Sequence, residues 1–462
     1  MARTKNTLLT IASIVTLGGL LFGHNTAVVN GSLSFIVQNW GISDWTQGII
    51  SSALTLAAAF GAVFGGGISD RIGRKKMLRS IAWVYLIGAL GCAAAPNVGV
   101  LIAARFLLGL AVGSASAVVP LYLAEISAPE KRGKMVGLNQ VMIVGGQFLA
   151  FLLNAVIGSI FIDNPSIWRV MMGIATLPSI VMIIGMTRVF ESPKWLVKQG
   201  KMQNAIQIIK SIYHDEEEQR QEIAELQQLL QPQVSGSVTD KIPGWAWRVL
   251  FIGCLLGVIQ QFVGINAIMY YSTNILEKYG FGQKAALIFN VLNGVICVLA
   301  SWVGMNIADK LGRKKLENTG LILCAISLVL VGVLSNLLAG QAFAPYVILI
   351  MIFCYIFAFQ GAVGPCTWIL ISEIFPAKYR GTFTGVAVFV LWIANFLVGL
   401  LFPVLVNIIG INALFYGFAA CAVIGIIIVN TMVPETKGKS LEEIESYFSG
   451  KHDDFGGKVK SL

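Results

Sequence analysis

Side-chain amides lie inside several long apolar runs of this sequence. Asn25 and Asn30 interrupt the run LGGLLFGHNTAVVNG at 17–31. The others are Gln147, Gln260, Gln261, Asn266, Asn293, Gln360 and Asn395. Polar groups in apolar surroundings are costly unless they are hydrogen-bonded, so such residues line a cavity or join two helices. Because an amide both donates and accepts, the set suits a ligand that carries many hydroxyl groups.

The sequence repeats three charged motifs at about half its length. ISDRIGRKK (68–76) returns as IADKLGRKK (307–315), and AEISAPEKRGKMVG (124–137) returns as SEIFPAKYRGTFTG (372–385). ESPK at 191 is echoed by ETKG at 435. The offsets are 239 to 248 residues in a chain of 462, which indicates two duplicated halves.

The duplication relates the amides to one another. Gln147 and Asn395 are 248 residues apart, and Asn25 and Asn266 are 241 apart, so each pair occupies equivalent positions in the two halves. A single amide in a membrane helix is more often a contact between helices. Matched amides in both halves favour a shared central binding site instead.

Aromatic and helix-breaking residues accompany the amides. Phe22, Trp368 and Trp392 would either stack on the ring of a sugar-like ligand or simply pack in the core. Gly264 and the segment GAVGP at 361–365 place Gly and Pro beside the polar residues. We expect the helices to bend or unwind at these two places, where they line a cavity.

Twelve apolar runs are long enough to carry these residues across a membrane. The chain is 56% hydrophobic and 12% charged, and each run can cross a hydrocarbon core of about 30 Å. The expected spans are 8–30, 46–68, 78–95, 99–122, 135–159, 167–187, 247–272, 284–307, 318–338, 343–371, 382–407 and 411–433. The first lacks a small-residue cleavage site, so it is interpreted as an uncleaved helix. We expect an all-α membrane protein with twelve transmembrane helices in two pseudo-symmetric six-helix bundles.

Positive charge lies mainly on one side of these spans. Of 33 Lys and Arg residues, 29 lie in the N-terminus, the loops after even-numbered spans or the C-terminal tail. This bias explains the net charge of +10 without nucleic acid, and it predicts a plasma membrane protein with cytoplasmic termini. The predicted parts are an N-terminal bundle (1–190), a cytoplasmic linker with short amphipathic helices (191–246), a C-terminal bundle (247–433) and a cytoplasmic tail (434–462).

Acids and cations recur at matched helix ends in both halves. In each half an Asp precedes an Arg by four residues and a Glu precedes an Arg by seven. These residues are Asp70, Arg74, Glu125 and Arg132 in the first half, and Asp309, Arg313, Glu373 and Arg380 in the second. They either only set the topology or form a latch, meaning ion pairs on the cytoplasmic side that break when the two halves part.

Other chemistries find little support in the sequence. The seven cysteines all lie in predicted spans without a C-x-x-C pair, so they are interpreted as packing residues. Three scattered histidines, His24, His214 and His452, predict no metal site. Because no nucleophile–base pair or phosphate-binding loop occurs, we expect neither an enzyme nor a cofactor. One chain contains both halves, so a monomer suffices.

Several motifs resemble those of the sugar porters of the major facilitator superfamily, over essentially the whole chain. They are DRIGRKK (70–76), ESPKWL (191–196), QQFVGINAIMYYS (260–272), GPCTWILISEIFP (364–376) and PETKG (434–438). The stretch 118–158 looks most like the bacterial branch that carries myo-inositol and monosaccharides with protons. The resemblance implies two six-helix bundles around a central site that opens to each side of the membrane in turn.

The resemblance also implies a role for each set of residues. The sugar ligands would be Gln147, Gln260, Gln261, Asn266, Asn293, Trp368 and Asn395, with Phe22, Gln360 and Trp392 adding to the lining. Tyr270 and Tyr271 match aromatic residues that close the outer gate. The latch would comprise Glu125, Arg132, Glu191, Arg313, Glu373 and Arg380, with Asp70, Arg74, Asp309 and Glu435 beside them.

Asn25 departs from the proton-coupled members, in which the resemblance implies an aspartate tuned by an arginine at the position of Arg105. Asparagine cannot titrate, and the facilitative glucose transporters of animals commonly have it here. We find no Asp or Glu inside a predicted span. We therefore expect Asn25 to hold substrate and transport of a hexose, pentose or cyclic polyol such as myo-inositol to be facilitative. The alternatives are a symporter altered from Asp to Asn, proton coupling through another group such as His24, a sugar sensor and a drug efflux pump.

Overall fold

The computed structural model describes residues 6–213, 215–228 and 242–450. Within them the secondary structure is helical, without a β-strand, and twelve stretches are long and apolar enough to cross a membrane. The all-α class and the number of spans are therefore confirmed. An even number of crossings returns the chain to the side on which it began. We call that side the terminal side and the opposite one the far side.

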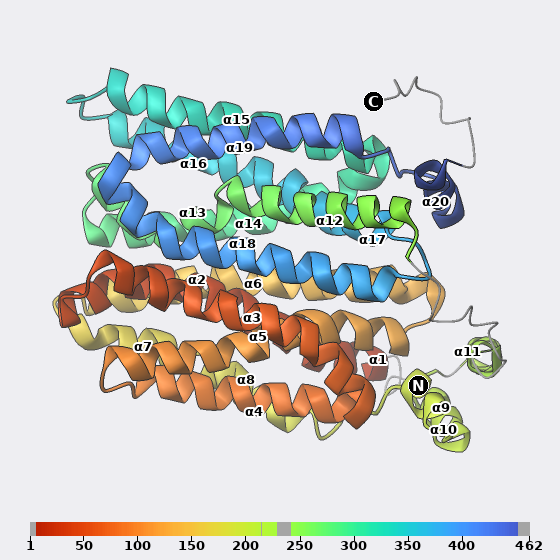
Figure 1. Cartoon of the computed structure of the whole chain (residues 1–462). Coiled ribbons are helices and arrows are strands. Elements are labelled where there is room, and N and C mark those ends of the chain that lie inside the picture. The colour runs from red at the N-terminus through yellow and green to blue at the C-terminus, as the bar shows by residue number, and fades with distance from the viewer. Residues whose placement is uncertain (1–5, 214, 229–241, 451–462) are drawn as a thin grey trace. The chain divides into compact units, whose positions relative to one another are not determined.

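The first half supplies six spans followed by short helices. The spans are α1 (Asn6–Val15) with α2 (Leu17–Trp40), α3 (Asp44–Ile72), α4 (Arg74–Ala93), α5 (Val98–Ile126), α6 (Pro129–Ile160), and η1 (Pro165–Ile167) with α7 (Trp168–Gly173) and α8 (Thr176–Gly185). The amphipathic helices predicted in the linker are confirmed as α10 (Met202–Ile212) and α11 (Glu216–Gln228), preceded by α9 (Pro193–Lys198). Figure 1 shows these three near α1.

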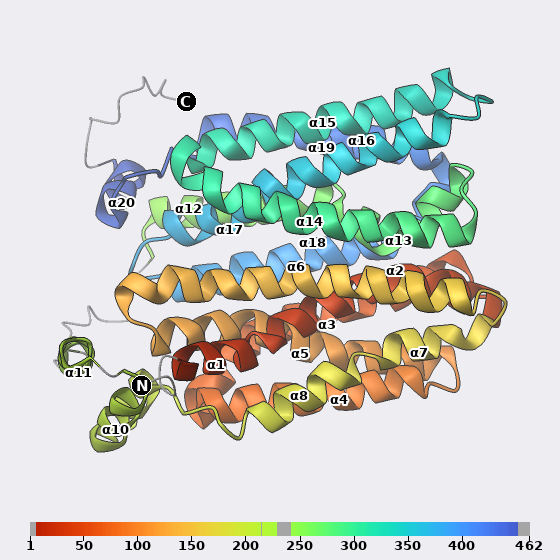
Figure 2. The same cartoon turned by 180° about the vertical axis from the view of Figure 1, so that it is seen from behind.

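The second half supplies the other six spans and one tail helix. They are α12 (Gly244–Phe262) with α13 (Ile265–Lys278), α14 (Gln283–Leu311), α15 (Arg313–Leu337), α16 (Ala344–Ala358) with η2 (Phe359–Val363) and α17 (Gly364–Ile374), α18 (Arg380–Ile409), α19 (Ile411–Met432) and α20 (Leu441–Ser449). Helix α15 runs beside α16 and α19 (Figures 1 and 2).

Two spans of the second half are interrupted where the glycines predicted it. Helix α12 gives way to α13 at Gly264, whose φ of 96° favours glycine, and a side chain there would collide with the ring of Phe418. Between α16 and α17 the chain forms the π-helical turn η2. Such wide turns are rare and occur mostly at functional sites.

Two compact units cut across the sequence halves. One comprises Met1–Val238, Asn266–Val298 and Asn395–Ile409, and the other comprises Thr239–Ile265, Leu299–Ala394 and Gly410–Leu462. The first unit therefore takes the far-side parts of three second-half spans, namely α13, the start of α14 and the end of α18. The predicted bundle boundaries follow the duplication and stay a prediction.

The ninth span corrects one expectation from the sequence. Hydropathy places its start at 318, whereas α15 begins at Arg313, because Gly312 ends α14 with a φ of 92° and the next helix starts at once. Glu317 therefore lies inside the helix, within the span Arg313–Leu337, and only 1% of its surface is exposed. The expectation that no acid lies within a span is wrong at this residue.

Candidate functional site

Asn25 on α2 and Gln147 on α6 lie where the backbones of these two helices approach closely. A side chain at Gly23 would collide with the carbonyl oxygen of Ile143, so the approach requires glycine. Asn25 is buried, and its Nδ2 donates to the carbonyl oxygen of Leu21 at 2.8 Å. Gln147 is also buried, and its Oε1 has no hydrogen-bond partner among the described residues.

Asn30 is the centre of a buried polar network in the far-side part of α2. Its Nδ2 donates to the carbonyl oxygen of Met269 at 2.8 Å and to the hydroxyl of Ser272. Its Oδ1 accepts from the backbone N–H and the hydroxyl of Thr273, at 3.1 and 2.5 Å, and from Asn290 at 3.2 Å. The network joins α2 to α13 and α14.

Two of the predicted sugar ligands connect to this region. The Nδ2 of Asn293 donates to Asn290 at 2.7 Å, and its Oδ1 has no hydrogen-bond partner within the described chain. Asn395 on α18 accepts from the hydroxyl of Tyr270 at 3.2 Å. The remaining predicted contacts of the first unit are Phe22 on α2 and Asn266 at the start of α13, both half-buried.

The predicted gate residues pack against the far-side end of α18. The hydroxyl of Tyr271 donates to a backbone carbonyl of α18 at 2.6 Å, and its ring stacks on Phe402 with centroids 5.1 Å apart. Nearer the helix ends, Asn407 accepts from Lys278 at 3.1 Å and donates to Asp44 at 2.6 Å. Spans from both sequence halves are thus bonded together on the far side within the first unit.

The predicted ligands of the second unit centre on a pair of glutamines. Gln261 donates to the side-chain oxygen of Gln260 at 3.1 Å, and Gln260 donates to the carbonyl oxygen of Gly364 at 3.1 Å. This joins α12 to the start of α17. The other predicted residues are Gln360 in η2, half-buried, Trp368 on α17, 43% exposed, and Trp392 on α18, buried.

The predicted proton-coupling position consists of Asn25 and Arg105, and no acid lies there among the described residues. Arg105 on α5 is buried, and its guanidinium donates to the carbonyl oxygens of Ile50 at 2.5 Å and Ser51 at 3.4 Å. His24 is also buried, and neither ring nitrogen has a hydrogen-bond partner in the described part of the chain. The guanidinium of Arg105 is therefore hydrogen-bonded by backbone carbonyl oxygens.

The charged motif of the first half forms ion pairs on the terminal side of the first unit. Arg74 donates through Nε and Nη2 to the two carboxylate oxygens of Glu125, both at 2.9 Å, and lies 2.6 Å from Asp70. Glu191 accepts from the backbone N–H of Lys75 at 3.0 Å, at the start of α4. A carboxylate there also suits the positive end of the helix dipole.

The second half repeats this arrangement within its own unit. Glu435 accepts from the backbone N–H of Arg313 at 2.9 Å, and the guanidinium of Arg313 lies 3.5 Å from Glu373. Arg380 donates to the carbonyl oxygen five residues earlier at 3.2 Å. The side chain of Asp309 lies outside the described part. These pairs connect residues of the same half, and a latch between the halves stays a prediction.

Glu225 on α11 is a linker residue that the sequence did not single out. It lies 2.6 Å from the ammonium of Lys194 on α9 and 3.6 Å from the guanidinium of Arg132. Partial burial would raise the pKa of Glu225, but the two cations outweigh it and hold the pKa below its ordinary value. The linker helix is thus fastened to the base of the first unit.

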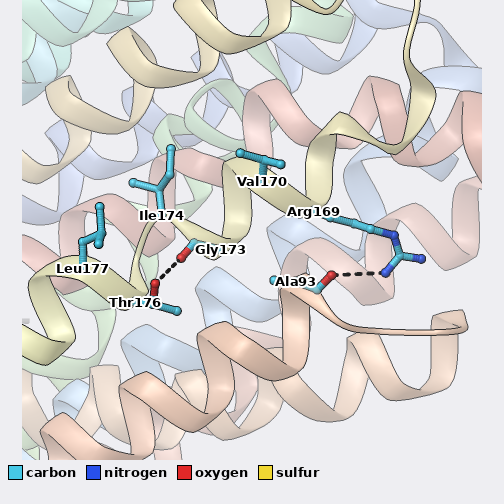
Figure 3. A pocket seen from close by; sticks show the side chains of 7 residues that line it. All are labelled: Ala93, Arg169, Val170, Gly173, Ile174, Thr176 and Leu177. Atoms are coloured by element: carbon cyan, nitrogen blue, oxygen red, sulfur yellow. Dashed lines mark hydrogen bonds between the residues drawn. The ribbon is translucent and has the colours of Figure 1, made fainter.

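A surface groove in the first unit contains none of the predicted ligands. Figure 3 shows it between the end of α4 and the pair α7 and α8, with Arg169 donating to the carbonyl oxygen of Ala93 at 3.2 Å. The other lining residues are Val170, Gly173, Ile174, Thr176 and Leu177. This mostly apolar lining does not fit a ligand with many hydroxyls.

Sequence reasoning missed Ser272, Thr273 and Asn290 around Asn30. Asn290 could have been found, because it lies one helical turn before Asn293 and therefore shares its face. Ser272 and Thr273 are small polar residues that give no signal by themselves, since such residues often bond to their own helix backbone.

Comparisons with known proteins show which family this chain is similar to. A family profile described as Sugar (and other) transporter matches residues 11–448. The major myo-inositol transporter IolT of Bacillus subtilis is 42% identical, over 97% of each chain. The glucose transporter GlcP of Staphylococcus epidermidis is 37% identical, over 93% of this chain and 94% of its own.

Solved structures are similar over the same length. The xylose transporter XylE from E. coli, in a partially occluded inward-open conformation, has a TM-score of 0.82 at 28% identity and covers 94% of this chain and 100% of that one. The proton:xylose symporter XylE bound to 6-bromo-6-deoxy-D-glucose has a TM-score of 0.77 at 29% identity, over 96% and 100%. These likenesses are to transporters and not to enzymes. With its twelve spans, this chain belongs to the sugar transporter family of the major facilitator superfamily.

Proposed function

We propose that the protein is an alternating-access carrier of a monosaccharide or of a cyclic polyol such as myo-inositol. The observation that carries the proposal is a pair of buried acceptors, Gln147 Oε1 and Asn293 Oδ1, without a hydrogen-bond partner among the described residues. An unsatisfied buried acceptor is costly, and a sugar hydroxyl would supply the missing donor. Both residues belong to the ligand set predicted from the sequence.

The named relatives support this substrate class. They include a myo-inositol transporter, a glucose transporter and a D-xylose transporter of Levilactobacillus brevis, the last 35% identical over 94% of both chains. Hexoses, pentoses and inositol each have a ring that carries several hydroxyl groups. The remaining ligands that we propose are Asn25, Gln260, Gln261, Asn266, Gln360 and Asn395 through their amides, and Phe22, Trp368 and Trp392 through their rings.

We also propose that charged and polar contacts gate the carrier on its two sides. We assign the outer gate to Tyr270 and Tyr271, supported by their bonds to α18 and by the network of Asn30. The latch residues of each half hold the helix ends of the terminal side. The predominance of Lys and Arg on that side supports its placement in the cytoplasm.

Exchange of labelled sugar by protein in sealed lipid vesicles tests the proposal. With equal pH on both sides, vesicles loaded with unlabelled myo-inositol, glucose or xylose should take up the same labelled solute. Replacing Gln147 by alanine removes one hydrogen-bonding amide, so the half-saturating concentration should rise about tenfold. The matched control is Gln203→Ala, an exposed glutamine of α10. Absence of exchange with all three solutes contradicts the function.

A further inference from the structure

We propose that Glu317 carries the proton in this carrier, and that Thr367 links its protonation to the sugar-binding helix α17. The inference rests on the proposed function and deepens it. The sequence favoured facilitative transport because no acid was found inside a predicted span. Glu317 lies buried inside a span of the structure, so this reason no longer holds.

Glu317 lies in a place where a carboxyl group has little support. Its Oε1 accepts from the hydroxyl of Thr367 at 2.9 Å, while its Oε2 has no hydrogen-bond partner among the described residues. Thr367 is fully buried on α17, directly before Trp368. The carboxyl group therefore contacts the same helix that presents a proposed ring-stacking residue to the substrate.

The helix contacted by Glu317 is the interrupted one. Helix α15 packs so closely on η2 that a side chain at Gly320 would collide with Ala362 and Val363. The π-helical turn also contains the proposed ligand Gln360. An interrupted helix can change its direction at the wide turn more readily than a regular one. Movement of α17 against α15 would separate Thr367 from Glu317.

The cations near Glu317 are engaged elsewhere. Arg313 lies by Glu373 and donates its N–H to Glu435, and Lys314 donates to carbonyl oxygens at the end of α19 at 3.0 and 2.7 Å. The remaining titratable groups facing this region are Cys324 on α15, Cys366 on α17 and Tyr355 on α16. η2 contributes none. No cation is therefore paired with Glu317 among the residues described.

These surroundings favour one protonation state for each arrangement of α17. A carboxylate with a single hydrogen bond and no paired cation is unfavourable in an apolar interior, whereas a protonated carboxyl group is tolerated. Once α17 has moved and Glu317 meets water, the carboxylate form is favoured. A difference in proton affinity between two states of the carrier is what coupling requires. One proton binds Glu317 from the more acidic side and is released to the other with each sugar.

The three residues that the sequence analysis considered for proton coupling are poorer carriers. Asn25 has no proton to exchange, and Arg105 keeps its proton at physiological pH. His24 has no hydrogen-bond partner in the described chain to which it could pass one. Glu317 combines an exchangeable proton with a direct contact to a substrate helix.

Sealed vesicles with an alkaline lumen and an enclosed pH-sensitive dye test the assignment. The unchanged protein should accumulate labelled sugar above its external concentration, and added sugar should acidify the lumen. Glu317→Gln, a neutral residue of the same shape, should keep counterflow at equal pH within about twofold and lose both accumulation and acidification. The control Glu442→Gln changes an exposed glutamate of α20 and should behave as the unchanged protein.

Two further results complete the test. Thr367→Val removes the hydroxyl and keeps the shape, so the pH profile of exchange should shift, an effect that loss of packing alone would not produce. This variant serves if Glu317→Gln does not fold. Accumulation by Glu317→Gln at the level of the unchanged protein overturns the inference, and so does counterflow without lumen acidification in the unchanged protein. Lack of counterflow by the unchanged protein overturns the proposed function itself.

Discussion

The Nδ2 atom of Asn25 donates a 2.8 Å hydrogen bond to the carbonyl oxygen of Leu21, one turn earlier in α2. An ionised aspartate cannot make this donation and would face the carbonyl oxygen with its charge. We therefore expect Asn25→Asp to slow exchange about tenfold at neutral pH and to recover at acid pH, where the carboxyl group donates again. Counterflow measured between about pH 5 and pH 8 tests this, and a flat profile would contradict it.

Arg74 should be among the residues on which stability depends most. It is 2% exposed and binds both oxygens of Glu125, so Arg74→Gln leaves a nearly buried carboxylate without its cation. Loss of one partner of a buried pair costs about 3–5 kcal/mol. The control is Arg79→Gln, an exposed change on the same helix that should alter stability by less than about 0.5 kcal/mol. Unfolding of the purified protein in detergent measures both, and equal losses would refute the assignment.

The hydrogen bonds around Asn30 predict that different substitutions at this residue weaken the far-side part of the first unit to different degrees. Asn30→Ala leaves the donors of Thr273 and Asn290 without their acceptor, at about 1–3 kcal/mol for a buried group. At acid pH the protonated carboxyl group of Asn30→Asp keeps both an acceptor and a donor, so this variant should lose less. Hydrogen exchange of the Thr273 amide, measured at acid pH, should quicken in the order Asp, then Ala, while Gln38→Ala, exposed on the same helix, leaves it unchanged. Exchange that is insensitive to Asn30 would mean that helix packing alone protects α13.

Docking of α11 should depend on pH through Glu225. Its pKa is lower in the folded protein than in the unfolded chain, so its contribution is present above the unfolded pKa and is lost as pH falls through the folded one. We expect protease cleavage within α11 to increase below about pH 4, and the effect to be at most about 1 kcal/mol because the pair is partly exposed. Glu225→Gln should remove the pH dependence. A persistent dependence in that variant would assign it to another group.

Replacing Gly73 or Gly312 should destabilise the protein, because the backbone angle and the neighbouring atoms both disfavour a side chain there. Their φ angles are 99° and 92°, and a side chain would collide with the carboxylates of Glu191 and Glu435 respectively. We expect each change to alanine to cost at least about 1 kcal/mol of unfolding free energy. Gly66→Ala in α3, where the added carbon meets nothing within 4 Å, is the control and should be neutral or stabilising. Unaltered unfolding temperatures for the first two variants would count against this account.

The sequence predicted the spans because crossing a membrane demands a long apolar helix, and it predicted the interruptions because Gly264 and the 361–365 segment cannot continue a regular helix easily. It placed the start of α15 too late, because hydropathy excludes the charged first turn of the helix. In the structure the helix begins directly after Gly312. Asn290 could be found from its spacing to Asn293, but its contact with Asn30, and that of α13, could not be predicted. Which helix faces it depends on packing between segments far apart in the chain, and only the structure shows this.

The long sequence separation between Asn30 and its partners has a consequence for the synthesis of the protein. A chain is synthesised from its N-terminus, so α2 enters the membrane early. The carbonyl oxygen bonded by Asn30 belongs to Met269, which is 239 residues further along. Asn30 therefore lacks its final partners in the growing chain until the seventh and eighth spans have been inserted. A chain that stops after the first half would leave the buried amide of Asn30 without the partners that α13 and α14 provide.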